Sequence, residues 1–305
     1  ERRDFFLDSN GVTVQCPLAS IGDQGEVNGK IFTKRNRDQI TTENASSTCT
    51  SGIVDMSWLF AEEFNFNEPL NSWDTSSVTD MEAMFLLAFS FDQPLDKWDT
   101  SSVVSMQAMF SSAESFNQPI QSWDTSAVTD MNAMFTFALA FNQPLNEWDT
   151  SSVNGMRTMF WVAPSFNQPL DQWNTEAVLD MSRMFNGASS FNRPISGWNT
   201  SSVTNMSGMF AEAESFNQPL TTLNTVSVTD MSFMFAGAIS FDQDIGNWDT
   251  RTVTNMEGMF KGARLFNSDL SSWCVELIPF EPTEFDERAM AWILSRPIWG
   301  TCPNG

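Results

Sequence analysis

Apolar side chains recur along this chain with a period of 25 residues. The pattern F-N-Q-P-L-x-x-W-D-T-S-S-V-T-D-M-x-x-M-F-x-x-A repeats with few changes, and its first phenylalanine falls at 66, 91, 116, 141, 166, 191, 216, 241 and 266. A fixed period of this length is typical of repeat proteins whose units stack to share one core. We therefore predict an elongated solenoid over residues 53–273, between an N-terminal cap (1–52) and a C-terminal cap (274–305).

The second half of each period has a helical spacing of apolar residues. Val78, Met81, Met84 and Ala88 follow one another at intervals of three or four residues, as on one face of a helix. The preceding Asp-Thr-Ser-Ser run consists of residues that cap helices. We expect one short core-facing helix in each unit.

The first half of each period, F-N-Q-P-L-x-x-W, is short and rich in aromatic and branched residues. It predicts a strand that pairs in parallel with its copies, with the proline at the strand's end or at a bulge. The predicted fold class is thus α/β: a leucine-rich-repeat-like solenoid with one short strand and one short helix per repeat and disulfide-bonded caps. In the C-terminal cap, Thr283 and Pro297 predict the start and stop of a further helix of about three turns.

These repeats resemble a known family. The segment S-F-N-Q-P-L-x-S-W-D-T-S-S-V-T-D-M-x-x-M-F is similar to the BspA-like repeat of bacterial surface proteins, which is grouped with leucine-rich repeats. The similarity covers roughly residues 53–273, in nine copies. It implies a secreted or surface-displayed protein used for attachment and matrix contact, without catalytic residues.

The four cysteines lie only in the two caps. Four cysteines allow three pairings, and a solenoid that holds its ends apart favours Cys16–Cys49 and Cys274–Cys302. Four buried thiols are the alternative. Paired cysteines indicate an oxidising compartment, so we expect a secreted or cell-surface protein. The chain begins with Glu1 instead of methionine, which we interpret as the result of leader removal.

Charge and composition narrow the function. The chain has 38 acidic and 15 basic residues, a net charge of −23, which disfavours nucleic acid and anionic membrane surfaces as partners. It has no apolar run of about 18 residues, so we expect a soluble chain without membrane insertion. Histidine is absent. Without an imidazole, the usual Ser-His-Asp and Cys-His sites cannot be built, and we expect no enzyme and no catalytic residues.

Two polar columns are candidate ligand sites. The first holds Asp or Asn at 74, 99, 124, 149, 174, 199, 224 and 249. Carboxylates stacked about 4.8 Å apart would repel one another, so bound Ca²⁺ is one interpretation. Because Asn replaces Asp three times, we favour Asx turns or helix caps and predict no metal and no cofactor. The column that starts at Asn67 favours a turn ladder in the same way.

Several side chains are candidates for glycan attachment. The sequons begin at Asn44, Asn199 and Asn205. A threonine column could carry O-linked sugars, and its first candidates are Thr75, Thr100, Thr125 and Thr150. Turn structure is the favoured interpretation of this column, and a match to an ice lattice is the least favoured.

A candidate contact surface comes from aromatic residues that the repeat does not require. We expect an apolar stripe on one face, made by Trp58, Phe89, Phe137, Trp161 and Phe233. The chain ends are also apolar and add Phe5, Phe6, Leu7 and Trp299. We hypothesise that the N-terminal tail docks on a neighbouring copy, which would give a head-to-tail filament. Folding of the tail onto its own cap is the alternative, and the sequence favours neither.

These observations predict a non-enzymatic extracellular repeat protein that acts as a structural scaffold, self-assembling head to tail into a surface filament or matrix. The alternative is a monomeric module for cell-surface adhesion or carbohydrate binding. The expected partners are other copies of the chain, another extracellular protein or a glycan.

Overall fold

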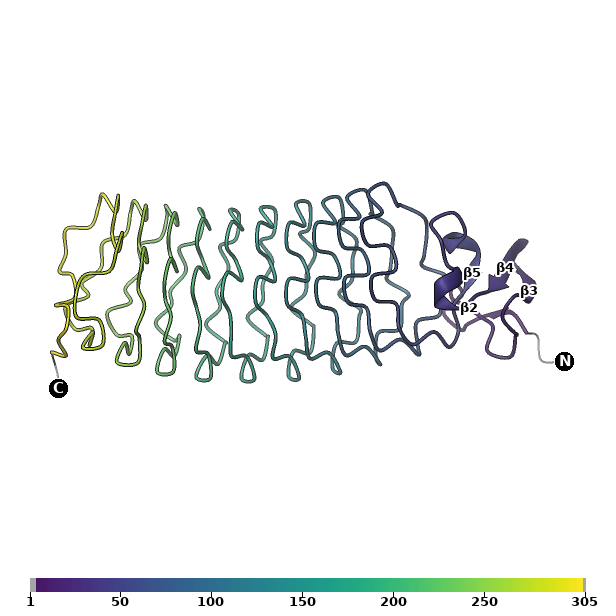
Figure 1. Ribbon diagram of the computed structural model, residues 1–305, viewed down its shortest axis with the longest axis horizontal. Helices are drawn as coiled ribbons and strands as arrows, with labels where there is room; N and C mark the ends of the chain where they lie inside the picture. Colours follow the sequence, from purple (N-terminus) through teal and green to yellow (C-terminus); the bar gives the residue numbers. More distant parts are fainter. Residues whose placement is uncertain (1–3, 304–305) are drawn as a thin grey trace.

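The structure is a computed structural model that describes residues 4–303. Successive coils of chain stack along the long axis, and the two ends of the chain lie at opposite ends of the molecule (Figure 1). A small cap with the regular strands closes the N-terminal end, and an altered coil closes the C-terminal end.

The N-terminal cap contains two small sheets. Strand β1 (Phe6–Leu7) pairs antiparallel with β2 (Val14–Gln15). In the second sheet, β3 (Gln24–Val27) pairs antiparallel with β4 (Lys30–Lys34), which pairs in parallel with β5 (Thr48–Cys49). The side chains between these sheets form a core separate from that of the coils. This small core contains Phe5, Val14, Cys16, Val27, Phe32 and Cys49.

Two 3₁₀ helices lie in the connection between β4 and β5. They are η1 (Arg37–Gln39) and η2 (Ala45–Ser47). A capping box formed by Asn36 and Gln39 fixes the start of η1. Ile40 directly follows η1, and Ala45 is the first residue of η2. Both side chains are buried in the main core, so this segment covers the first coil.

Successive coils meet in a line of single parallel β-bridges. The bridged residues recur every 25 positions: Asp55, Asp80, Ser105, Asp130, Gly155, Asp180, Asn205, Asp230 and Asn255. From Asp80 onward, acidic and uncharged residues alternate in this bridge column. Carboxylates are therefore separated by two coils instead of one, which reduces their repulsion.

The prediction of one helix per unit is wrong: residues 4–303 contain no α-helix. In each coil, two positions four residues apart adopt positive φ, as in Ala83 (50°) and Leu87 (61°). This left-handed backbone interrupts an α-helix at once. Glycine occupies these positions in several coils, at 187, 208, 237, 258 and 262.

The turns satisfy the backbone donors in two alternating ways. The N–H groups of Met81, Ala83 and Phe85 donate to carbonyls of the next coil at 2.8–3.0 Å. The N–H groups of Met84 and Leu86 donate instead to the carbonyl three residues earlier, at 3.3 and 3.1 Å. Alternate donors thus hold one coil to the next, as in a parallel sheet, although the backbone between them is a series of turns.

The prediction of a parallel strand over F-N-Q-P-L-x-x-W is also wrong. This segment has no β-bridges, and the bridges lie at the Asp80 column instead. Side chains connect the coils here: the backbone N–H of Asp92 donates to Asn67 Oδ1 at 2.9 Å, and the indole of Trp98 donates to the Leu70 carbonyl at 3.0 Å. Because proline cannot donate to a ladder, side-chain amides and indoles take over the connection.

Identical side chains do lie directly over one another in the core. Phe85 and Phe110 stack with centroids 5.5 Å apart and rings inclined by 7°, and Trp98 and Trp123 stack at 6.3 Å and 4°. Both methionine columns are fully buried in the same core as these rings, from Met81 to Met259. The apolar spacing therefore identified the core residues correctly, although it predicted the wrong backbone.

The helix predicted from Thr283 is absent; this segment is a tenth coil. Positive φ recurs at Glu284 and Arg288, each 26 residues after Gly258 and Gly262. The N–H of Gly258 donates to the Thr283 carbonyl at 3.0 Å, so the coil-to-coil bonding continues. One extra residue thus lengthens the last coil and shifts the side chains that follow it.

This shift ends the aromatic columns. At the 26-residue spacing, Asp286 corresponds to Phe260 and Arg296 to Leu270, and the two charged side chains form an ion pair at 2.9 Å. The Arg296 guanidinium lies over the Trp292 ring at 4.2 Å. Trp292 meets Phe266 edge to face at 4.8 Å, so the last ring turns across the stack.

Candidate functional site

The cysteines pair as predicted. Cys16 is bonded to Cys49, and Cys274 is bonded to Cys302. The first bridge lies in the small core of the N-terminal cap, and the second joins the segment after the ninth coil to the end of the tenth. Structural disulfides are typical of proteins in oxidising compartments. Within the described residues, none of the helices has the length and apolar character that crossing a membrane requires.

The Asp74 column forms Asx turns. Asp124 Oδ1 accepts from the backbone N–H of Ser126 at 3.0 Å and from its hydroxyl at 2.6 Å. The Ser126 hydroxyl holds the pKa of the Asp124 carboxyl below its ordinary value. Asn174 makes the same backbone contact with Glu176 at 3.0 Å, which explains why asparagine serves equally well. Across residues 4–303, no group of three or more His, Cys, Asp or Glu side chains is placed to hold a metal ion.

The Asn67 column forms a complete side-chain ladder. Each member's side-chain oxygen accepts from the backbone N–H of the next member at 2.9–3.0 Å, from Asn67 through to Asn267. At the last coil, Asn267 accepts instead from Ile293 and Leu294. These side chains bind the coils together, and one oxygen of each is used in the ladder.

The threonine candidates for O-linked sugars are buried. Thr75, Thr100, Thr125 and Thr150 are each 1% exposed. Every hydroxyl donates to a carbonyl of the next coil at 2.8–2.9 Å. These hydroxyls are therefore inaccessible to a glycan in the folded protein.

The three sequons differ in how free their amide groups are. The Asn44 amide donates to the Gln39 carbonyl at 3.0 Å, and the Asn205 amide lies 3.5 Å from the Asp180 carboxylate. Asn199 is exposed, and of its side-chain atoms only Oδ1 has a protein partner, Ser201, among the described residues. Asn199 is thus the sequon with the most accessible nitrogen.

The N-terminal tail folds onto its own cap. Phe5 is buried in the small core, where it lies against the backbone of Gly25, and Phe6 and Leu7 form β1. The preceding residues 1–3, which belong to the predicted tail, lie outside the described part of the chain. At the other end, Trp299 packs edge to face on Phe285 at 4.8 Å. Phe5 and Trp299 are thus each in contact with residues of their own chain.

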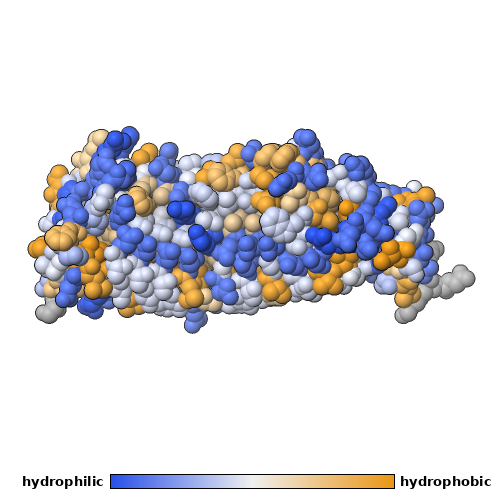
Figure 2. All heavy atoms as spheres, viewed as in Figure 1, coloured by the Kyte–Doolittle hydropathy of each residue, from blue (hydrophilic) through white to orange (hydrophobic). Residues whose placement is uncertain are grey.

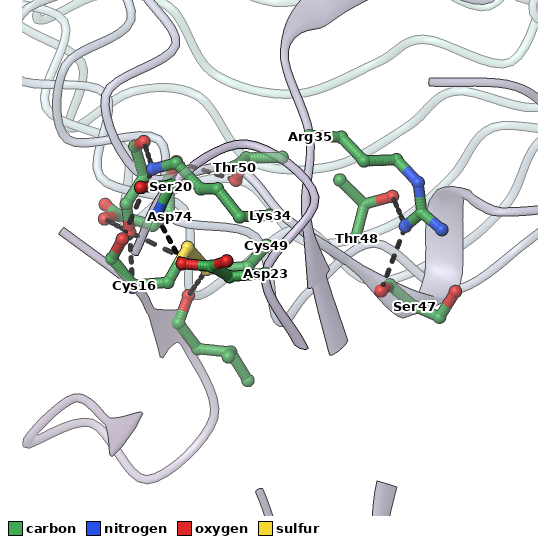
Figure 3. Close-up of a disulfide and its surroundings, with 12 residues drawn as sticks. Cys16, Ser20, Asp23, Lys34, Arg35, Ser47, Thr48, Cys49, Thr50 and Asp74 are labelled. Atoms are coloured by element: carbon green, nitrogen blue, oxygen red, sulfur yellow. Dashed lines mark hydrogen bonds between the residues drawn. A yellow bond between two sulfur atoms is a disulfide. The ribbon is translucent and has the colours of Figure 1, made fainter. Parts of the chain in front are cut away.

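A polar cluster that the sequence did not predict joins the N-terminal cap to the first coil (Figure 3). The Ser51 hydroxyl donates to the Asp74 carboxylate at 2.5 Å, and Lys34 Nζ donates to the carbonyls of Ser51 and Cys16. Burial lowers the pKa of Lys34 and the nearby Asp74 opposes this shift. Ser51 is buried and its hydroxyl is used in this network, so the cluster fastens the cap instead of presenting a nucleophile.

The predicted aromatic stripe is divided into separate contacts. Phe137 and Trp161 meet with ring centroids 5.2 Å apart, whereas Phe89 stacks on Phe64 at 5.1 Å in another column. Trp58 is half exposed in the first coil. On the face shown in Figure 2, apolar residues likewise form separate patches and no continuous band.

Two of these aromatic residues line one groove. Trp161 and Phe233 stand at an open hollow of about 510 Å³ that crosses the coils between them. Its other lining residues are polar or small and include Arg183, Asn186, Ser207, Ala211, Glu212 and Ser232. We call this hollow the Trp161–Phe233 groove; it combines one partly exposed and one exposed aromatic ring with free polar side chains.

Comparison with known proteins identifies a repeat family. The sequence family described as "Mycoplasma protein of unknown function, DUF285" matches four overlapping segments, residues 29–146, 95–198, 136–234 and 191–280. No curated protein and no solved structure matches the chain. The match supports a repeat family and does not itself confirm the resemblance to BspA-like repeats. Because the matched segments together run from 29 to 280, the chain belongs to the family described as Mycoplasma protein of unknown function, DUF285.

Proposed function

We propose that this protein is a non-enzymatic extracellular scaffold, a stiff monomeric rod that holds its two ends apart. The observation that carries the proposal is the use of polar side chains inside the repeat. The Thr75, Asn67 and Trp98 columns all bond one coil to its neighbour. A coil held along three lines by hydrogen bonds has little freedom to bend or slide.

The two closed ends support a monomer over a filament. At the N-terminal end, Phe5 is occupied within its own cap. At the C-terminal end, the Asp286–Arg296 ion pair lies where the repeat has Phe and Leu, so a further coil would bury both charges. Burying charges without new partners is costly, which disfavours stacking of a second copy on this end.

The scaffold proposal is tested by shortening the rod. Deletion of residues 101–150 removes two full periods and joins equivalent positions. At about 4.8 Å per coil, the maximum dimension measured by small-angle X-ray scattering should fall by about 10 Å, with a monomeric mass at all concentrations. A flexible scattering profile, or wild-type protein that polymerises, would contradict the proposal.

A second candidate function, adhesion through a bound ligand, is favoured by one feature. The Trp161–Phe233 groove interrupts the otherwise regular surface with side chains that the repeat does not require. Such a site and the scaffold role are compatible, because a rod can display a binding surface along its side.

A further inference from the structure

The Trp161–Phe233 groove is formed by a local run of small residues. Its lining includes Ala211, Ala236 and Gly208. At the positions equivalent to the two alanines, other coils have larger side chains, such as Leu86 and Thr136. It shares Glu212 and Ala236 with a neighbouring hollow of about 410 Å³ that reaches Lys261. The two hollows together follow the long axis across several coils.

Positive-φ glycines position the side chains at the edges of the groove. A Cβ at Gly258 would lie 2.4 Å from the Phe233 ring, and one at Gly237 would lie 2.4 Å from the Glu212 carboxyl group. Each glycine therefore lets a side chain of the preceding coil lie across the surface of the next coil. Arg183 lies over Gly208 in the same way, with a closest separation of 3.2 Å to a Cβ at that position.

The polar groups of the groove are free, in contrast to those of the repeat columns. Within residues 4–303, the side chains of Asn186, Glu212 and Ser207 have no hydrogen-bond partner, and neither does the Trp161 indole. The Arg183 guanidinium lies 6.0 Å from the Trp161 ring and makes no ion pair in this part of the chain. A positively charged group, a negatively charged group and neutral hydrogen-bonding groups are thus all available near the Trp161 ring.

We propose that this groove binds an oligosaccharide. The apolar face of one sugar ring stacks on Trp161, and Phe233, three coils away or roughly 15 Å along the axis, contacts another part of the glycan chain. Asn186 and Arg183 donate to sugar hydroxyls, and Glu212 accepts from them. This goes beyond the scaffold role, because it assigns a ligand class to the side of the rod.

Other classes of ligand fit this groove less well. Nucleic acid is disfavoured by the net charge of −23. A peptide that adds a strand needs free backbone donors, and the donors of Arg183 and Gly208 are already bonded to the next coil at 2.8 and 2.7 Å. An apolar helix would meet polar side chains between the two aromatic rings.

The test is a printed panel of neutral and acidic oligosaccharides, followed by titration calorimetry with each glycan that binds. Wild-type protein should bind at least one glycan, and Trp161→Ala should weaken that binding roughly tenfold or more, as expected for an aromatic anchor. The matched control is Trp58→Ala, which removes a tryptophan that is half exposed and lies outside the groove, and it should leave affinity unchanged. Glu212→Gln keeps the shape of the side chain and should weaken binding severalfold.

Three results would overturn the proposal: a panel without any hit, affinity retained in both Trp161→Ala and Glu212→Gln, or an equal loss in Trp58→Ala. Glu212→Gln also serves if Trp161→Ala does not fold, because Glu212 is exposed. The scattering experiment on the shortened rod is independent of glycan binding, so failure of the site and failure of the scaffold role are distinguishable.

Discussion

The two ends of the coil array are closed by different means. The N-terminal end is covered by a separate segment that has regular strands and its own small core around Cys16–Cys49. The C-terminal end has no new fold: one inserted residue, the Asp286–Arg296 pair and the turned ring of Trp292 convert the repeat into its own terminus. A stack can thus be ended by adding a lid or by changing a few side chains of the last coil.

The largest expected effect is loss of a disulfide at either end. The bridges close segments with sequence separations of 33 and 28, so unfolded-chain entropy predicts nearly equal losses of about 4 kcal/mol for Cys16→Ser/Cys49→Ser and Cys274→Ser/Cys302→Ser. Urea unfolding of both double variants measures this. A much larger loss at the N-terminal end would indicate that the lid unfolds separately from the coils.

A smaller effect is expected at the junction between the N-terminal cap and the first coil. Asp74→Asn removes the carboxylate that accepts from Ser51 and lies near Lys34, and it should cost about 1–2 kcal/mol at pH 7, with solvent screening limiting the share from Lys34. The control is Asp99→Asn, the next member of the column, which should have little effect because the column contains asparagine at Asn174.

The same junction predicts a pH dependence. Burial holds the pKa of Lys34 below its ordinary value of 10.5, so between these two values the unfolded chain binds more protons and stability rises with pH. Removal of the Asp74 charge lowers the pKa of Lys34 further and widens this window. Denaturation of Asp74→Asn and wild type at several pH values should therefore show a penalty that shrinks in alkali. A constant penalty would contradict the role of Lys34.

At the C-terminal end, the ion pair is predicted to control association more than stability. Arg296→Leu should cost about 1 kcal/mol, since both partners are partly exposed. Asp286→Phe/Arg296→Leu restores the residue types of the inner coils and should give a concentration-dependent mass in sedimentation velocity. Arg296→Lys, which keeps the charge, should stay monomeric. A monomeric double variant would show that other features end the stack.

The smallest effect is expected at glycines of positive φ near each end. A Cβ at Gly52 would lie in open space, and one at Gly262 would make ordinary contacts at 3.7 Å, so alanine at either should cost about 1 kcal/mol from backbone strain alone. Gly258→Ala adds a clash with Phe233 and should cost more than Gly262→Ala. Thermal unfolding of the three variants checks this order.

The sequence allowed prediction of the core but not of the backbone. Met81, Met84 and Ala88 are all buried, as their spacing predicted, because i−3 turns bring the same side chains inward as a helix would. Gly208 and Gly258 were the signal for turns, because each would lie inside the predicted helix, where glycine is unfavourable. The strand over F-N-Q-P-L-x-x-W failed because Asn67 and Trp98 connect the coils through side chains instead of main-chain pairs.

The candidate site was predicted only in part. Trp161 and Phe233 were identified because they depart from the repeat, and both line the groove. The groove itself depends on Gly208 and Ala211, small residues whose effect is visible only when the coils are stacked. The hydrogen bond from Lys34 to the Ser51 carbonyl was missed for a similar reason, since nothing in their sequence positions indicates that these residues meet.

The alternation of charge in the bridge column has a consequence for how such an array changes length. From Asp80 to Asn255 every acidic member after the first has an uncharged member above and below it. Loss of a single unit with an uncharged member, or gain of one with an acidic member, would place two carboxylates side by side, whereas gain or loss of 50 residues keeps them apart. The one adjacent pair, Asp55 and Asp80, lies at the N-terminal end of the column, where hydrogen bonds from Ser57 and, to a lesser extent, the charge of Arg37 lower the pKa of Asp55. A change by a pair of units therefore preserves the charge spacing wherever it occurs, whereas a change by one unit preserves it only if an acidic member is lost or an uncharged member is gained.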